Sequence, residues 1–160
     1  MVVSEGAGGD WLVRERASRG LENLVLLPYQ PFDQLPDVLG TADVLLALLA
    51  SDAGVFSVPS KILSSLCAGR PVLAAMPLAN LGARTIEGAG AGIVVAPDDV
   101  EGFLAGAEKL LADERLRHHQ GRSARAYAEQ TFDIERITDR FEPILSSVQR
   151  ESSAGKKARG

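Results

Sequence analysis

The sequence predicts an α/β domain built around a doubly wound parallel sheet. Five short apolar runs divide the chain, and none of them alternates apolar with polar residues; they cover residues 1–3, 24–27, 44–49, 71–76 and 92–96. Strands with this pattern are typical of a parallel sheet, which is buried on both faces. Between the runs lie stretches of about ten or more residues with helical periodicity, which is the βαβ order of an α/β fold.

Length and composition predict one packed domain. The chain has 160 residues, of which 46% are hydrophobic, and a net charge of −4 that argues against a domain devoted to nucleic acid. We expect residues 1–149 to form the domain and the polar residues 150–160 to form a disordered tail. No apolar run reaches the roughly 18 residues of a membrane span, and no basic signal-peptide start is present, so a cytoplasmic location is predicted.

Glycines and caps mark the expected helix ends. Three helices should follow the last strand: residues 98–111, opened by a capping box of Asp98 and Glu101, residues 113–131, and one that starts near Asp133 and is kinked at Pro143. Glycines where a helix should end before the next strand are predicted C-caps. They are Gly20, Gly40, Gly69, Gly88, Gly90 and Gly92.

Four loops leave the carboxyl ends of the predicted strands, which is the edge where open α/β sheets bind ligands. They cover residues 5–10, 28–31, 51–57 and 77–80. In the first loop, Gly6, Gly8 and Gly9 match a phosphate loop only weakly, and a tight turn with Asp10 as helix N-cap explains them better. In the second, Tyr29 lies beside two prolines, where it could meet a nucleobase or pack on the adjacent helix.

The third loop leads into a helix start with the features of an anion site. Ser57 can cap the helix and Pro59 fits its first turn. Unpaired amides and the positive end of the helix dipole attract anions there. Lys61 adds a full positive charge, and a cation at a helix N-terminus is unfavourable unless an anion neutralises it. We therefore expect Lys61 to face a phosphate.

The histidines and the cysteine are not predicted to form a catalytic or metal site. His118 and His119 are adjacent and point in different directions on a helix, so we expect them on the solvated surface rather than at a metal. Cys67, the single cysteine, is expected in the core. Without a Ser-His-Asp arrangement or a metal-ligand cluster, hydrolytic and metal chemistry are disfavoured.

The order of segments resembles the C-terminal half of the group 1 (family 4) glycosyltransferases of GT-B fold, over roughly residues 1 to 148. The most specific matches are Ala42-Asp43-Val44 and Ala68-Gly69-Arg70-Pro71-Val72, and Val58-Pro59-Ser60-Lys61 resembles the transferases of colanic acid and O-antigen synthesis. The resemblance implies a Rossmann-like domain that binds a nucleotide-diphosphate sugar for retaining transfer to a cell-envelope polysaccharide or lipid-linked acceptor. It implies no cofactor and no essential metal, and it assigns no catalytic residue in this chain.

The resemblance also implies site residues. Pro28, Tyr29 and Gln30 would hold the base, with Ser64 at the ribose. The donor diphosphate and sugar would be contacted by Gly54, Val55, Phe56, Ser57, Ser60, Lys61 and Asn80. Phe56 and Ser64 stand where the family commonly has glutamates, so the charge-assisted bond to the ribose is replaced by a weaker neutral one.

In the family, a first βα unit supplies the central strand of the sheet. Met1 to Val3 of this chain resemble the strand that follows that unit. We therefore expect residues 1–3 to close against residues 44–49, or a second copy of the chain to fill the gap, because unpaired strand edges attract another chain. The acceptor domain would likewise lie outside this chain, which would be inactive in isolation. Two alternatives remain: a noncatalytic Rossmann-like binding or interaction module, and a sugar-nucleotide epimerase, against which the histidine positions argue.

Overall fold

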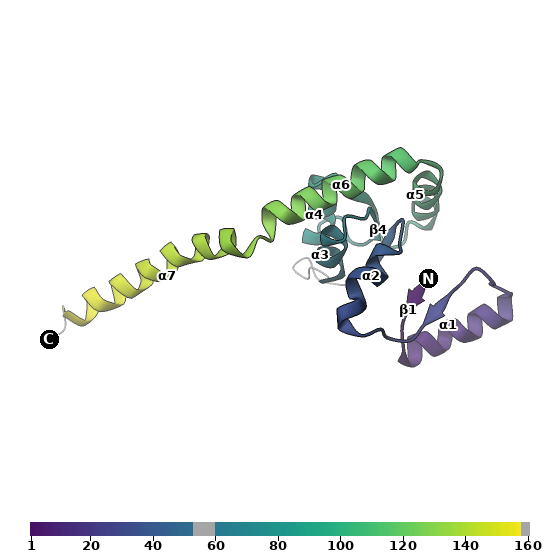
Figure 1. Cartoon of the computed structure of the whole chain (residues 1–160), viewed down its shortest axis with the longest axis horizontal. Helices are drawn as coiled ribbons and strands as arrows, with labels where there is room; N and C mark the ends of the chain where they lie inside the picture. The colour runs from purple at the N-terminus through teal and green to yellow at the C-terminus, as the bar shows by residue number, and fades with distance from the viewer. Residues whose placement is uncertain (53–59, 158–160) are drawn as a thin grey trace. The chain divides into compact units, whose positions relative to one another are not determined.

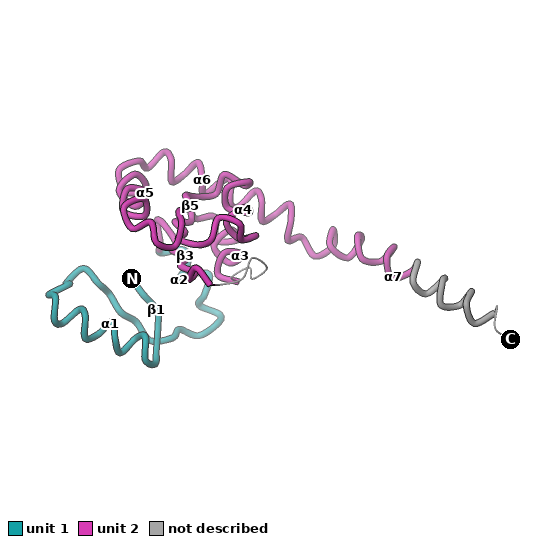
Figure 2. Tube along the Cα trace, turned by 180° about the vertical axis from the view of Figure 1, so that it is seen from behind, with its two compact units in different colours: residues 1–41 teal, residues 42–160 magenta. Residues whose placement is uncertain are grey.

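The computed structural model describes residues 1–52 and 60–157, with side chains up to residue 146. The chain forms two compact units: the N-terminal unit, residues 1–41, and the C-terminal unit, residues 42–160 (Figure 2). The elements of Figure 1 are, in order, β1 (Val2–Val3), α1 (Gly6–Arg19), β2 (Leu26–Leu27), a 3-10 turn η1 (Phe32–Gln34), α2 (Leu35–Gly40), β3 (Leu45–Leu48), α3 (Ser60–Cys67), β4 (Val72–Ala75), α4 (Leu81–Gly88), β5 (Gly92–Val95), α5 (Val100–Ala112), α6 (Glu114–Thr131) and α7 (Ile134–Lys157).

The five strands fall within the five apolar runs, and all of their pairings are parallel. They form two sheets, however: β1 pairs with β2, and β3, β4 and β5 pair in that order. Closure of β1 against β3 would join the two units, and it stays a prediction. The alternative, a second copy of the chain at this position, stays a prediction, as does a single domain over residues 1–149.

In the N-terminal unit, α1 connects the two parallel strands. Val2 lies opposite Leu26 and Val3 opposite Leu27. The prediction that Asp10 caps this helix is wrong, because the helix begins at Gly6 with Glu5 at its N-cap position. Gly6 has a φ of 72°, a left-handed conformation that suits glycine, and it turns the chain from β1 directly into the helix.

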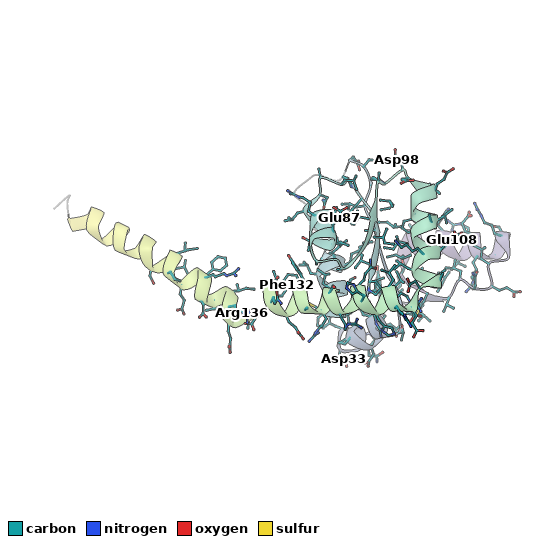
Figure 3. All side chains as sticks on the ribbon, turned by 90° about the horizontal axis from the view of Figure 1, so that it is seen from above. Asp33, Glu87, Asp98, Glu108, Phe132 and Arg136 are labelled. Atoms are coloured by element: carbon teal, nitrogen blue, oxygen red, sulfur yellow. The ribbon has the colours of Figure 1, made fainter. Side chains whose placement is uncertain are left out.

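In the C-terminal unit, β4 is the central strand and all four of its residues are buried. Helices α4 and α5 lie on opposite sides of the strands, and α6 passes across one end of the strands and ends at Phe132 (Figure 3). The core combines this sheet with the inner faces of α3, α4 and α6; its largest buried side chains include Ile62, Leu66, Val72, Met76 and Ile86.

Strand β3 departs from the expected burial on both faces. Ala47 is buried against the core, whereas Leu46 and Leu48 are 57% and 60% exposed. Leu46 lies next to Leu73 of β4 on the same face, and α5 covers that face at Leu73, where Gly106 approaches it closely. Because α5 packs on β4 and β5, the same face of β3 is left open.

The C-terminal helices agree with the predicted ranges but not with every predicted cap. The predicted capping box at Asp98 is wrong, because α5 is capped by Asp99, whose Oδ1 accepts a hydrogen bond from the Gly102 amide at 2.8 Å. Asp133 caps the start of α7, and Pro143 lies inside that helix, as expected. Helix α7 continues to Lys157, across the start of the segment for which a disordered tail is predicted.

The glycines expected at helix ends fall into two groups. Gly20, Gly69 and Gly90 have positive φ angles near 60°, as helix-ending glycines do. Gly40 and Gly88 are instead the last residues of α2 and α4, and Gly92 lies in β5, so the prediction of C-caps is wrong for these three. Gly92 serves the sheet: a Cβ there would collide with the backbone carbonyl of Val72 on β4.

Candidate functional site

The described residues predicted to contact the diphosphate, Ser60, Lys61 and Asn80, lie at the edge formed by the carboxyl ends of β3 and β4. Strand β3 leads to α3 and strand β4 leads to α4, so both helices begin at this edge. Ser60 and Lys61 are the first two residues of α3, and both are exposed. The predicted contacts at Gly54, Val55, Phe56 and Ser57, and Pro59 with them, lie outside the described residues.

The first turns of α3 and α4 are in direct contact. Gly82, in the first turn of α4, has no side chain, and a Cβ there would lie 2.5 Å from Cδ1 of Ile62 on α3. Ile62 is fully buried, so the contact is part of the core. The close approach places two helix N-termini side by side, and their positive dipole ends add to the charge of Lys61. This arrangement can bind an anionic group such as a diphosphate.

Asn80 has a structural role that the sequence analysis did not assign. Its side chain is fully buried, and its Oδ1 accepts a hydrogen bond from the Gly82 amide at 2.7 Å, which makes it the N-cap of α4. The signal was present in the sequence, because asparagine is a preferred N-cap and a helical pattern follows it. Its predicted contact with the donor stays a prediction.

Ser64 lies one turn after the start of α3 and is half-buried. Its hydroxyl donates a hydrogen bond to the carbonyl oxygen of Ser60 at 3.3 Å, and the neighbouring Ser65 does the same to Lys61 at 2.7 Å. A serine that donates its proton to its own helix keeps its oxygen lone pairs as acceptors. Ser64 can therefore still accept a hydrogen bond, and its predicted contact with a ribose stays a prediction.

The predicted base-binding loop belongs to the N-terminal unit and follows β2. The Tyr29 side chain is 65% exposed. The loop is held by two hydrogen bonds: the Tyr29 amide donates to Oε1 of Glu5 at 2.9 Å, and Nε2 of Gln30 donates to the Pro28 carbonyl oxygen at 2.8 Å. Glu5 is a residue that sequence reasoning missed. Its position directly after β1, at the same edge of the sheet as the loop, was the available signal.

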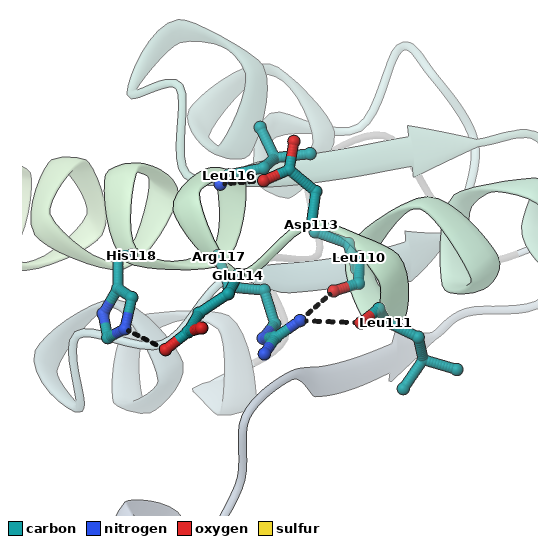
Figure 4. Close-up of polar contacts among 7 residues, drawn as sticks. All are labelled: Leu110, Leu111, Asp113, Glu114, Leu116, Arg117 and His118. Carbon is teal, nitrogen blue, oxygen red and sulfur yellow. Dashed lines mark hydrogen bonds and ion pairs between the residues drawn. The ribbon is translucent and has the colours of Figure 1, made fainter.

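The two histidines and the single cysteine lie outside this edge of the sheet. His118 and His119 are exposed, as expected, and Nε2 of His118 lies 3.4 Å from Oε1 of Glu114 (Figure 4). The expectation that Cys67 is in the core is wrong: it is the last residue of α3 and is exposed, while Leu66 and Ile62 occupy the buried face.

The described part of the chain has neither a metal-binding cluster nor a membrane-spanning helix. No three His, Cys, Asp or Glu side chains in ranges 1–52 and 60–157 are grouped so that they could hold a metal ion. In the same part of the chain, no helix is long and apolar enough to cross a membrane. The expectation of metal-independent chemistry stays a prediction.

Comparison with known proteins gives three similarities. Residues 1–113 match the family described as glycosyl transferases group 1. WcaI of Escherichia coli (strain K12), a glycosyl transferase named for colanic acid biosynthesis, is 31% identical over 141 residues, which are 88% of this chain and 34% of WcaI. The crystal structure of Anabaena Alr3699/HepE in complex with UDP superposes with a TM-score of 0.71 at 22% identity, over 86% of this chain and 36% of that chain.

These similarities confirm the predicted Rossmann-like α/β fold of a GT-B glycosyltransferase half. At 22% identity the likeness to HepE concerns the fold alone, whereas the family match extends over most of the chain. The chain spans about a third of the length of WcaI and of HepE. On the sequence match over residues 1–113, this chain belongs to the group 1 glycosyltransferases.

Proposed function

We propose that this chain is the donor-binding half of a retaining glycosyltransferase. In this proposal a nucleotide-diphosphate sugar is the donor, and a cell-envelope polysaccharide or a lipid-linked molecule is the acceptor. Membership of a transferase family, the colanic acid name of WcaI and the UDP bound in HepE support it. They also favour glycosyl transfer over the epimerase alternative.

The observation that carries the proposal is the contact between the first turns of α3 and α4 beside Lys61. In glycosyl transfer from a nucleotide sugar, the bond to the anomeric carbon breaks and the leaving diphosphate gains negative charge. Fixed dipoles and a lysine aimed at that charge stabilise the transition state more than the ground state. Lys61 and the two helix N-termini would act in this way, without a metal.

The remaining residues would orient the donor. Ser64 would accept a hydrogen bond from the ribose, and the loop of Pro28, Tyr29 and Gln30 would contact the base. The neutral Ser64 predicts weaker ribose binding than a carboxylate would give. The serine at position 64 is therefore the observation that favours the second candidate, a noncatalytic binding module that has kept the fold.

Isothermal titration calorimetry on the full chain tests the proposal. The titrants are UDP, GDP, ADP and TDP, together with their glucose conjugates. We expect one diphosphate nucleotide to bind, and the corresponding nucleoside alone to bind at least tenfold more weakly, because it lacks the diphosphate. Absence of binding of every diphosphate at millimolar concentration would contradict both candidates.

An assay of sugar transfer distinguishes the transferase half from the noncatalytic binding module. In the proposal the acceptor is bound by residues outside this chain, so transfer requires them. When the chain is joined to an acceptor domain from a relative such as WcaI, a transferase half should transfer sugar from the nucleotide that binds. A noncatalytic module should bind that nucleotide in the joined protein and transfer nothing.

A further inference from the structure

A basic cavity lies at the amino ends of β3 and β4, opposite the edge that carries Lys61. Its volume is about 430 Å³. Asp43, which precedes β3, and Arg70, which precedes β4, line it. The four residues of β4 span three steps of about 3.3 Å, so the strand separates this cavity from the start of α4 by at least roughly 10 Å. It is therefore a different place from the proposed donor site.

The charge of the cavity is opposite to that of the whole chain. Its charged lining residues are Arg70, Arg117, Arg122, Arg125, Asp43 and Glu114. Guanidinium groups remain charged at all ordinary pH values, so cations outnumber carboxylates here, even when Glu129, which pairs with Arg125 at 2.8 Å, is included. The chain as a whole has a net charge of −4. A local surplus of positive charge in an acidic protein indicates an anionic ligand.

Two of these arginines are fixed by the ends of helices. Nη1 of Arg117 donates to the carbonyl oxygens of Leu110 and Leu111, at the end of α5, at 2.6 and 2.9 Å (Figure 4). Nη1 of Arg125 donates to the carbonyl oxygen of Cys67, at the end of α3, at 2.7 Å. A guanidinium has five N–H donors, so both keep donors for a ligand. Their fixed positions lower the entropic cost of binding one.

The backbone shapes the cavity between the arginines. Glu114, Arg117, Gly121 and Arg125 recur at three- and four-residue intervals and therefore share one face of α6. Gly121 permits the helix to approach the turn after α3, because a Cβ there would lie 2.5 Å from the carbonyl oxygen of Gly69. The cavity therefore lies beside the place where this face of α6 meets the turn after α3.

We propose that this cavity binds the diphosphate group of a phosphorylated molecule, at a site separate from the donor site. Arginines bind phosphate oxygens through paired, charge-assisted hydrogen bonds, and several arginines around one cavity match a group with more than one negative charge. The diphosphate could belong to a soluble molecule or to a lipid headgroup. The inference does not depend on the proposed transferase activity.

The first test is calorimetric titration of inorganic pyrophosphate into the full chain carrying Lys61→Ala, which weakens binding at the other edge. In this background, Arg122→Gln should lower the affinity about tenfold, the effect of losing about 1.4 kcal/mol from a charged hydrogen bond. Arg115→Gln is the matched control, since Arg115 is exposed on the same helix and does not line the cavity. Equal affinities in the two variants, or no binding of pyrophosphate, would overturn the proposal.

The second test locates the ligand through Cys67, the single cysteine, which lines the cavity and is exposed. Pyrophosphate should slow its alkylation by iodoacetamide in the Lys61→Ala chain, and Arg122→Gln should remove that protection. Vesicles of phosphatidylcholine with diacylglycerol pyrophosphate, compared with vesicles of phosphatidylcholine alone, form the lipid arm. Protection by pyrophosphate and by the phosphate-bearing vesicles assigns a lipid headgroup, and protection by pyrophosphate alone assigns a soluble molecule. Protection by neither, or by the vesicles alone, contradicts the proposal.

Discussion

Replacement of Asn80 by alanine should destabilise the edge of the sheet that carries the proposed donor site. Asn80 is fully buried, and its Oδ1 accepts the hydrogen bond of the Gly82 amide at 2.7 Å. Alanine cannot accept that bond, and the amide is left buried without it. Loss of an N-cap costs about 1 kcal/mol, and an unsatisfied buried donor costs about 1–3 kcal/mol. Because the two terms overlap, we expect a loss of about 2–3 kcal/mol.

Urea denaturation of Asn80→Ala, followed by far-UV circular dichroism, measures this loss. In a chain of this size each kcal/mol shifts the melting temperature by roughly 2–4 °C, so thermal melting should show a decrease of roughly 4–12 °C. Asn80→Ser is the control, because serine is also a good N-cap and should recover at least half of the free energy. If serine and alanine destabilise equally, or if alanine has no effect, the cap is not what Asn80 contributes.

Three further predictions concern single positions. Gly92→Ala should lower the free energy of unfolding by more than about 3 kcal/mol, because the new Cβ would force β5 away from β4. Gly88→Ala, which has open space at the Cβ, should change it by less than about 1 kcal/mol. Similar values for the two variants would refute the collision at Gly92. Glu5→Gln should speed hydrogen exchange at the Tyr29 amide, and an unchanged rate would show that the carboxylate does not hold the loop. Cys67 should react with iodoacetamide without denaturant, and a protected thiol would contradict its exposure.

The positions of the strands could be predicted from the sequence because apolar runs bounded by glycine and polar residues carry that information locally. The pattern of Leu45–Leu48 could not reveal that one face is open, because that depends on where α5 packs. The N-cap residues of the helices were harder to predict than the strands. Asp98 and Asp99 are adjacent and both suit an N-cap, so only the backbone geometry distinguishes them.

The candidate site also has a part that the sequence predicts and a part that it does not. Lys61 at the start of a helix is a local property, and the structure places it where the sequence predicted. The contact of Gly82 with Ile62 and the bond of Glu5 with Tyr29 join residues about twenty positions or more apart along the chain. Periodicity and motif spacing carry no information about such pairs, so sequence reasoning missed both.

The central claim is that the first turn of α3 holds the diphosphate of a nucleotide sugar. Calorimetric titration of the nucleoside diphosphate that binds best, into Lys61→Ala and into Lys109→Ala, tests it most directly. Both lysines are exposed, and Lys109 lies in the last turn of α5. Since a hydrogen bond to a charged group contributes about 1.5–3 kcal/mol, Lys61→Ala should lower the affinity about tenfold or more and Lys109→Ala should leave it unchanged. Equal affinities in the two variants would contradict the claim.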